Sequence, residues 1–321
     1  MKYICIALIT AAVGLPAAHA QTYPTKVVRA IVPSAPGGSI DVVGRLVAQK
    51  LSETMGQQFI VENRAGAAGT IGVTQVTKAA PDGYTLLVAS QSGVSAAPSL
   101  IRNLPYDPQH DLTPIALMVI QPSVLVVHPS LPARTTKEFI ALAKTQPGML
   151  TYGSSGIGAT QHLSAELFAM MTGTELRHIP YKGGALAMTD VLGGQIYFMF
   201  CPVPTATPFL SANKMRALAV TSMRRVESIP DVPTLNESGV RSYDFSSWIG
   251  LLGPANLPRD IVTKLHGETM KVVAEPAMKK KLLDLGVSIP PAETPEKFAK
   301  FIAQDTATTA KVIKAAKVQP E

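Results

Sequence analysis

Short runs of aliphatic and β-branched residues alternate along the chain with stretches in which apolar residues recur at helical spacing. Between residues 26 and 90 this alternation predicts the order strand, helix, strand, helix, strand. The strands are expected at 27–32, 59–62 and 85–89, and the helices at 40–51 and 72–79. Strands and helices in this order are typical of a parallel sheet with helices on its faces.

The alternation continues after an apolar run at 115–128 that is interrupted at 121–123, where we expect two strands or one long bent strand. Further strands are expected at 150–152, 177–180, 196–200, 216–221 and 248–252, and further helices at 136–145, 161–172, 185–192, 259–273, 276–285 and 295–316. The pattern therefore predicts two α/β lobes with two strand-like connections between them. The interface between two lobes is a preferred place for a small-molecule cleft.

The first twenty residues have the features of a secretory signal. Lys2 precedes an apolar stretch at 3–15, and Ala18-His19-Ala20 fits a small-x-small cleavage site. Removal of this segment would leave residues 21–321, enough for two lobes with real cores. No later run reaches the roughly 18 uninterrupted apolar residues of a transmembrane helix. We therefore expect a mature protein that is soluble and periplasmic.

The formal net charge is +7, and basic residues are spread along the chain apart from the run at 279–281. A solvated helix face explains that run better than a nucleic-acid or membrane patch, so we expect no nucleic-acid partner. A mildly positive body favours encounter with small anions. The histidines lack the close spacing of metal ligands, and we expect neither a metal nor a cofactor.

Cysteine usage leaves one thiol in the mature chain. Cys5 lies in the signal segment and Cys201 has no cysteine partner, so we expect no intrachain disulfide. Cys201 also has no cysteine or histidine near it in the sequence, and we expect it to be a small buried hydrophobe at a strand end.

A loop rich in glycine and serine, VPSAPGGSIDVVGR at 32–45, follows the first predicted strand. Ligands of parallel sheets sit at the carboxyl ends of the strands, where such loops expose backbone N–H groups. Gly37 and Gly38 are expected to adopt positive φ, and Ser39 or Asp41 to cap the following helix. The N–H groups of that helix N-terminus attract an anion, most simply a carboxylate.

A second loop, YGSSGIGATQH at 152–162, repeats this arrangement in the other lobe. Its serine hydroxyls, its glycine hinges and the histidine that follows them are Gly153, Ser154, Ser155, Gly156, Gly158 and His162. Two such loops facing one cleft would hold a small acid from both sides. For either loop alone, an ordinary role as the start of a capped helix stays open.

Catalytic motifs fail at their required spacing. The G-x-S-x-G pattern that begins at Gly153 has Ile157 in place of its last glycine. The dinucleotide fingerprint lacks its third glycine at Gln161, and no phosphate-binding G-x-x-x-x-G-K-[ST] loop is present in the sequence. A secreted α/β hydrolase that uses Ser154 or Ser155 with His162 as the base stays the alternative.

Several stretches, taken in order, resemble the extracytoplasmic solute receptors of tripartite tricarboxylate transporters, also called the Bug family. The matching blocks are Tyr23-Pro24, VPSAPGGSIDVVGR at 32–45, VENRAGAAGTIG at 61–72, PDGYTLLVAS at 81–90, YGSSGIGATQHLSAELF at 152–168, PYKGGA at 180–185, RALAVTS at 216–222, PDVPTLNESG at 230–239 and WIGLLGPANLP at 248–258. The resemblance covers essentially the whole chain after the signal segment.

This resemblance implies a two-lobed α/β periplasmic binding protein of the Venus flytrap type (type II-like), each lobe a mainly parallel sheet flanked by helices. Such a protein captures a small carboxylate in the cleft between its lobes and delivers it to the membrane subunits of a tripartite tricarboxylate transporter. A receptor that signals to a partner is the alternative within the same family. We expect lobe 1 at 22–122 and 251–321, lobe 2 at 123–250, and a monomer that is not an enzyme.

The resemblance also implies which positions hold the ligand. Carried over by position, and with the far-end residue included, they are Ser34, Ala35, Pro36, Gly37, Gly38, Ser39, Asp41, Ser90, Gln91, Gly153, Ser154, Ser155, Gly156, Gly158, Thr160, His162 and Cys201.

This chain departs from the family pattern at two positions. Many relatives have an aromatic residue in place of Ser34, so ring stacking on the ligand is absent there. Many have an aspartate in place of Cys201, where it meets the far end of the ligand. Because a thiol does not pair with a cation, Cys201 argues against an amino acid and for a ligand whose far end is apolar, aromatic or weakly polar. Thr205 or Thr207 is the alternative source of a polar contact.

Overall fold

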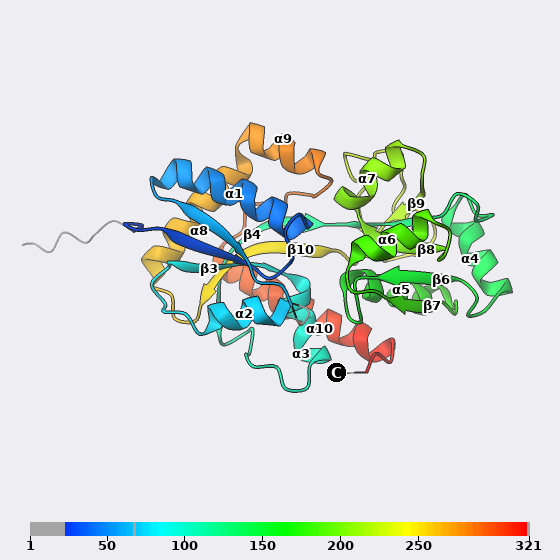
Figure 1. Ribbon diagram of the computed structural model, residues 1–321, viewed down its shortest axis with the longest axis horizontal. Coiled ribbons are helices and arrows are strands. Elements are labelled where there is room, and N and C mark those ends of the chain that lie inside the picture. Colours follow the sequence, from blue (N-terminus) through cyan, green and yellow to red (C-terminus); the bar gives the residue numbers. More distant parts are fainter. Residues whose placement is uncertain (1–22, 67–68, 320–321) are drawn as a thin grey trace, which may run out of the picture.

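Two five-stranded sheets flanked by helices lie next to each other along the long axis of the molecule (Figure 1). The computed structural model describes residues 23–66 and 69–319. The expected signal segment, residues 1–20, lies outside the described residues. The two sheets confirm the two α/β lobes that the hydrophobic pattern predicts. Across the described residues, no helix has both the length and the apolar character that crossing a membrane requires.

The first sheet has the strand order β2-β1-β3-β10-β4. Its strands are β1 (Val28–Val32), β2 (Phe59–Asn63), β3 (Thr85–Ser90), β4 (Leu112–Gln121) and β10 (Ser247–Pro254). Around it lie α1 (Ser39–Met55), α2 (Thr70–Thr77), the π-helix η2 (Ser92–Ala96), α3 (Ala97–Leu100), α8 (Arg259–Ala274) and α9 (Pro276–Asp284). β1 is parallel to β2 and β3, whereas β10 runs antiparallel between β3 and β4.

The second sheet repeats this plan with the order β7-β6-β8-β5-β9. Its strands are β5 (Ser123–Val127), β6 (Thr151–Ser154), β7 (Arg177–Pro180), β8 (Phe198–Pro202) and β9 (Arg216–Val220). Its helices are α4 (Thr136–Thr145), α5 (Thr160–Thr172), α6 (Gly184–Leu192) and α7 (Val203–Ser211). β6 is parallel to β7 and β8, and β5 runs antiparallel between β8 and β9. Each sheet is thus mainly parallel with one reversed strand.

The chain passes from the first sheet to the second at Pro122, between the last residue of β4 and the first of β5. Proline has no N–H to donate to a strand ladder, so the apolar run at 115–128 divides there into two strands of different sheets. The return passage differs from the expected boundary at 250/251. Residues 247–250 pair with β3 and β4 in the first sheet, because all eight residues of β10 are buried and extend that sheet.

Alternation along the strands places a core on each face of the first sheet. Ala30 and Val32 pack with the inner face of α1, whereas Ile31 between them packs on the opposite side with Val73 of α2. On α1, the buried residues Val43 and Val47 recur at helical spacing.

The last helix, α10 (Pro295–Ala315), packs on both lobes. Phe298 and Ile302 belong to a hydrophobic cluster of the first lobe. Val312 and Ile313, near the other end, belong to the cluster that contains Phe168 of α5 in the second lobe. Figure 1 shows α10 crossing from beneath the first sheet toward α5. The C-terminal helix therefore ties the lobes together, a packing that the sequence leaves open although residues 251–321 are expected in lobe 1.

Candidate ligand-binding cleft

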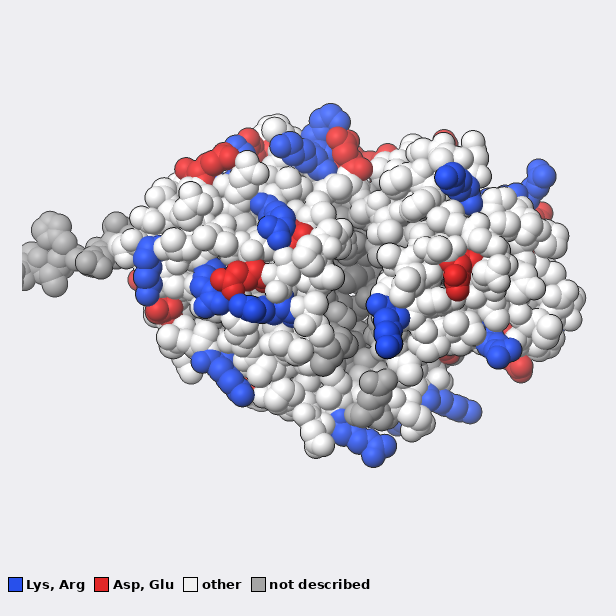
Figure 2. All heavy atoms as spheres, in the orientation of Figure 1, with Lys and Arg blue, Asp and Glu red and all other residues white. Residues whose placement is uncertain are grey.

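A cleft of about 620 Å³ lies between the two lobes and is lined by residues of both. Figure 2 shows the hollow, with charged side chains scattered over both lobes and not gathered into one patch. Predicted site residues that line the cleft are Ser34, Ala35, Pro36, Gly37, Gly38, Ser39, Ser90, Ser155, Thr160 and Cys201. The two glycine-rich loops thus meet at one cavity, although they are separated by more than a hundred residues in the sequence.

Five strands direct their carboxyl ends to this cleft. The cleft is lined by residues at the last position of a strand or just after it, and the strands concerned are β1, β3, β6, β7 and β8. Each of these strands leads into a helix. The helices α1, α5 and α6 begin without a hydrogen bond from a capping side chain. Their first-turn N–H groups are therefore left to a ligand or to solvent, and the helix dipole favours an anion at each.

The first loop takes its shape from Gly37 and Asp41. Gly37 has φ of +80°, which favours glycine, whereas Gly38 has φ of −71° and is the N-cap of α1. The expectation of positive φ is therefore confirmed for Gly37 and wrong for Gly38. Asp41 does not line the cleft: its carboxylate accepts from the Gly37 N–H over 2.9 Å, so it folds the loop back onto the helix and does not cap it.

Asp41 is a buried anion with its charge compensated. Its carboxylate also accepts from Arg45 Nε over 3.0 Å and from Asn63 Nδ2 over 2.8 Å. Burial acts to raise the pKa of Asp41, but the hydrogen bonds from Arg45, Gly37 and Asn63 together hold that pKa below its ordinary value. The conformation of the first loop is thus held by an ionised carboxylate that is not part of the cleft lining.

Unpartnered polar atoms also line the cleft. Ser34 Oγ and Gln121 Nε2 are buried and have no hydrogen-bond partner among the described residues. Gln121 lies opposite Ser247 where β4 pairs with β10, so the polar floor of the cleft comes from the strands that connect the lobes. Buried polar groups without partners are costly unless something bonds them, which suits a ligand-binding position.

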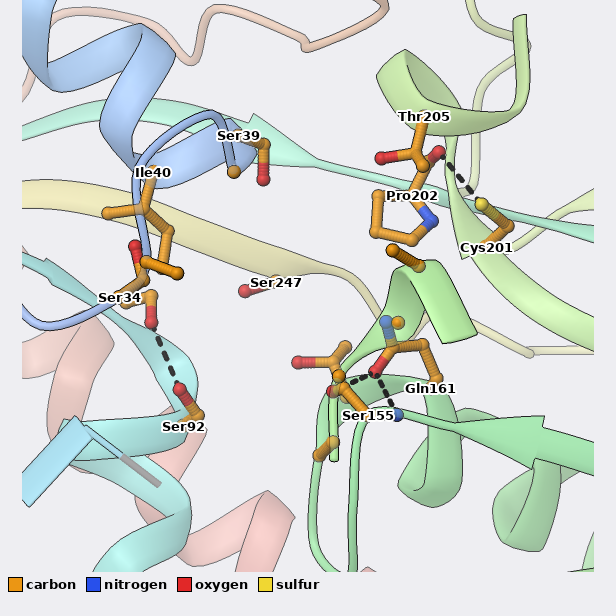
Figure 3. Close-up of a pocket in the computed structure, with 18 of the residues that line it drawn as sticks. Ser34, Ser39, Ile40, Ser92, Ser155, Gln161, Cys201, Pro202, Thr205 and Ser247 are labelled. Carbon is orange, nitrogen blue, oxygen red and sulfur yellow. Dashed lines mark hydrogen bonds between the residues drawn. The ribbon is translucent and has the colours of Figure 1, made fainter. Parts of the chain in front are cut away.

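In the second loop, Ser155 and Thr160 line the cleft and the other predicted residues lie behind them. Ser155 Oγ donates to Gln161 Oε1 over 2.7 Å (Figure 3). Gly156 has φ of +135°, a region that favours glycine. Gly153 and Gly158 do not line the cleft; a Cβ on Gly153 would lie 2.8 Å from Ala187, so this glycine lets α6 pack on β6.

Two stacked histidines support the second loop from behind. The rings of His162 and His178 are 3.9 Å apart and nearly parallel. His162 Nδ1 accepts from the Gly158 N–H over 2.9 Å, and His178 Nε2 lies 2.6 Å from Ser154 Oγ. Burial, together with the neighbouring His178, lowers the pKa of His162 to about 3, and burial lowers the pKa of His178 to about 4. Both rings are therefore neutral near pH 7.

This arrangement does not provide the serine–histidine pair of the hydrolase alternative. Ser154 is fully buried and bonds to His178, while Ser155 bonds to Gln161. His162 is occupied by the loop backbone at Nδ1. A nucleophile needs a hydrogen bond to its base and access to substrate, and none of these serines has both.

Gln91, which was predicted to contact the ligand, lies beside the cleft and not on its surface. It is buried, and it bonds to Thr160 in the other lobe and to Asp305 on α10. Its place in the structure is therefore that of a bridge between the lobes.

Cys201 lines the cleft from the end of β8, as expected, and its side chain is fully buried. Its Sγ donates to the carbonyl of Pro202 over 3.4 Å (Figure 3), and burial raises the pKa of the thiol. The thiol is thus neutral and belongs to the same hydrophobic cluster as the lining residue Met199. Of the two threonines considered, Thr205 lines the cleft, whereas the Thr207 hydroxyl donates to Val203 O in its own helix.

The loop between β7 and α6 contributes cleft residues that were not predicted from the sequence. Lys182, Gly183 and Gly184 line the cleft, and Lys182 is the one charged side chain among the described lining residues. The signal was present, since a glycine pair follows a predicted strand here as it does after the first strand. The remaining lining residues that were not predicted are Ile40, Ser92, Gln121, Ser123, Ala159, Gln161, Ala185, Leu186, Met199, Pro202 and Ser247.

Metal-ligating side chains do not gather in this structure: among residues 23–66 and 69–319, no group of three or more His, Cys, Asp or Glu residues is placed to hold a metal ion.

The chain matches a family model described as "Tripartite tricarboxylate transporter family receptor" over residues 43–318. It is 34% identical over 315 residues to "Protein BugT" of Bordetella pertussis, an alignment that covers 98% of this chain and 96% of that protein.

Two solved structures are similar over nearly their whole length. The R. palustris protein Rpa4515 with adipate has a TM-score of 0.86 and 35% identity, covering 93% of this chain and 100% of that chain. The periplasmic binding protein BugD has a TM-score of 0.83 and 35% identity with the same coverage. These likenesses extend over both lobes and therefore include the cleft between them.

Proposed function

Because the chain belongs to the receptor family of tripartite tricarboxylate transporters, we propose that it captures a small carboxylate between its lobes in the periplasm and delivers it to the membrane subunits of such a transporter. Members of this family are solute-binding receptors and not enzymes. The hydrolase alternative is therefore dropped.

The charge of the cleft is the observation that carries the proposal. Lys182 is its one charged side chain among the described lining residues, and no described carboxylate lines it. The N-termini of α1, α5 and α6, which lack capping side chains, add partial positive charge from both lobes. Such an electrostatic environment favours a small anion as the ligand. The structure of Rpa4515, a similar protein, contains a carboxylate, adipate.

Because residues of both lobes line the cleft, a bound ligand would favour closure of the lobes around it. Ser34 and Gly37 belong to the first lobe, and Ser155 and Lys182 to the second. A ligand that bonds to both lobes has more contacts when they are closed, so its differential affinity shifts the population toward the closed form. Closure would in turn give the transporter a surface that distinguishes loaded from empty receptor.

Calorimetric titration and thermal unfolding of residues 21–321 test the binding step. The panel contains mono-, di- and tricarboxylates, aromatic acids and amino acids, with the matching primary amides as uncharged controls. We expect at least one acid to bind and to raise the unfolding midpoint, since a ligand of the native state stabilises it. The matching amide should leave the midpoint unchanged. Absence of binding by any acid, after a denaturation and refolding step that removes co-purified ligand, would reject the carboxylate proposal.

Delivery is tested by uptake of the radiolabelled acid into cells that lack this protein. Expression of the full chain should restore uptake in cells that contain the membrane subunits and not in cells that lack them. If binding is intact and uptake is independent of the protein, the transport part of the proposal fails and the signalling alternative gains support.

A further inference from the structure

A side pocket of about 240 Å³ opens from the cleft between α1 and α7. It shares Gly37, Ser39 and Thr205 with the main cleft, so the two spaces adjoin at these residues. Beyond these three residues its lining is Val42, Val43, Pro204, Pro208, Leu285 and Val287.

Both lobes contribute to this side pocket. Ser39 at the start of α1 and Thr205 on α7, both labelled in Figure 3, line it from the first and the second lobe respectively. Leu285 follows α9, which lies above the interval between α1 and α7 in Figure 1. The side pocket is thus a continuation of the space that a ligand spans when it contacts both lobes.

The lining of the side pocket is chemically different from that of the loops. Among the described residues that line it, the polar side chains are those of Ser39 and Thr205, which it shares with the main cleft, and none is charged or an amide. A second carboxylate placed there would lose its hydration without gaining a partner, which is strongly unfavourable. An alkyl chain or a ring placed there would instead leave water for an apolar surface.

The size of the side pocket sets an upper limit on such a group. Apolar cavities of roughly 150 Å³ hold a benzene molecule. A volume of about 240 Å³ therefore accepts one six-membered ring or a short alkyl chain. Lys182, the one cationic side chain among the described residues that line the cleft, matches a single carboxylate.

We propose that the ligand is a monocarboxylate whose apolar substituent, a single ring or a short alkyl chain, occupies this side pocket while the carboxylate binds at the glycine-rich loops. This inference rests on the proposed function and adds the substrate class to it. The side pocket, and not Cys201 alone, is then what selects the far end of the ligand.

The first test compares acids that differ only in the group meant for the side pocket. Calorimetric titrations of residues 21–321 use propanoate, butanoate, hexanoate and 3-phenylpropanoate, with succinate and adipate as dicarboxylates of matched length. Affinity should rise about four-fold for each methylene that enters the side pocket. We expect 3-phenylpropanoate to bind at least ten times more tightly than propanoate, and hexanoate more tightly than adipate.

The second test changes the volume of the side pocket. Val42 is half-buried on α1, and Val42→Phe would fill part of the space, whereas Val42→Ala would enlarge it. Val42→Phe should weaken 3-phenylpropanoate at least ten-fold more than butanoate, and Val42→Ala should move the preferred chain to a longer acid. Leu46→Phe, one turn further along the same helix and outside the lining, is the matched control and should leave the order of affinities unchanged.

The outcomes separate this inference from the proposed function. If succinate or adipate binds and the apolar monocarboxylates do not, the carboxylate receptor stands and the side-pocket proposal falls. If both Val42 variants keep the parent order of affinities, the proposal also falls. If no acid binds, the proposed function itself fails.

Discussion

Thr160 Oγ1 at the start of α5 donates a hydrogen bond over 3.2 Å to Oε1 of Gln91, which directly follows β3, and so joins the two lobes beside the cleft. The amide of Gln91 donates in turn to Asp305 on α10 over 3.0 Å. The other oxygen of that carboxylate accepts from the indole of Trp248, on β10, over 2.8 Å. One chain of hydrogen bonds therefore links the second loop, the helix that spans both lobes and a strand next to the return passage.

Gln91→Met should destabilise the protein, because it removes both amide contacts while nearly keeping the side-chain volume. The loss leaves Asp305 short of a donor, and we expect the free energy of unfolding to fall by about 1–3 kcal/mol. Thr160→Val, which removes one neutral bond, should cost about 1 kcal/mol. Urea unfolding followed by the emission of Trp248, the single tryptophan, measures both.

Thr207→Val is the matched control for these variants, since the Thr207 hydroxyl bonds only within α7. Its effect should stay within about 0.5 kcal/mol. Parent-like stability of Gln91→Met would show that the bridge contributes nothing.

Gly156→Val should impair ligand binding as well as stability. Gly156 has φ of +135°, where a side chain costs about 1–3 kcal/mol, and the loop would move to relieve it. Gly173→Val, at the C-terminus of α5, carries a similar strain at φ of +64° but lies away from the cleft. Calorimetry with whichever acid of the panel binds the parent protein most tightly should find lost affinity in Gly156→Val alone. Equal affinities of the two variants would refute the assignment of this loop to the site.

Lys182→Met should weaken binding of the tightest-binding acid of the panel by about ten-fold or more, since hydrogen bonds to charged groups contribute about 1.5–3 kcal/mol. The effect should be larger at low ionic strength, because salt screens the attraction of an exposed lysine. Lys144→Met, on α4, removes the same charge far from the cleft and serves as the control. If both variants lose affinity equally, the contribution is one of overall charge and not of a lysine in the site.

The stacked histidines predict a loss of stability in weak acid. The folded state holds the pKa values of His162 and His178 at about 3 and 4, whereas an unfolded histidine has a pKa of about 6.5. Above pH 6.5 both states are neutral and the full stability is present. As the pH falls from 6.5 toward 4, only the unfolded state takes up these protons, so the free energy of unfolding decreases.

The comparison variant is His162→Asn combined with His178→Gln, which keeps polar groups near Gly158 and Ser154 without a titrating ring. Since one pKa unit corresponds to about 1.4 kcal/mol, each histidine contributes about 3 kcal/mol between pH 6.5 and pH 4, and the parent should lose on the order of 6 kcal/mol more than the variant between pH 7 and pH 4. Urea unfolding at four pH values checks this, and parallel curves for the two proteins would contradict it.

Local sequence was sufficient for the order of elements and for the two loops. Continuous apolar runs located β1 and β3, because a strand with a core on each face is buried at nearly every position. Helical spacing of apolar residues located α1, because one face of that helix is buried. Ser34–Ser39 and Ser155 were found because glycine and serine after a buried strand have a local physical meaning, and these residues do line one cleft. Gly38 was assigned the wrong φ, because a pair of glycines does not say which of them turns the chain.

Tertiary structure decided the rest, because it depends on which distant segments pair. The pairing of 247–250 with β3 and β4, the two-lobe packing of α10 and the bridge from Gln91 to Thr160 join residues far apart in the sequence. His178 supports Ser154, and Val42 and Pro208 line one side pocket, only after both sheets have formed. Sequence periodicity reports which face of an element is buried, whereas the partner across that face is set by register and packing between elements.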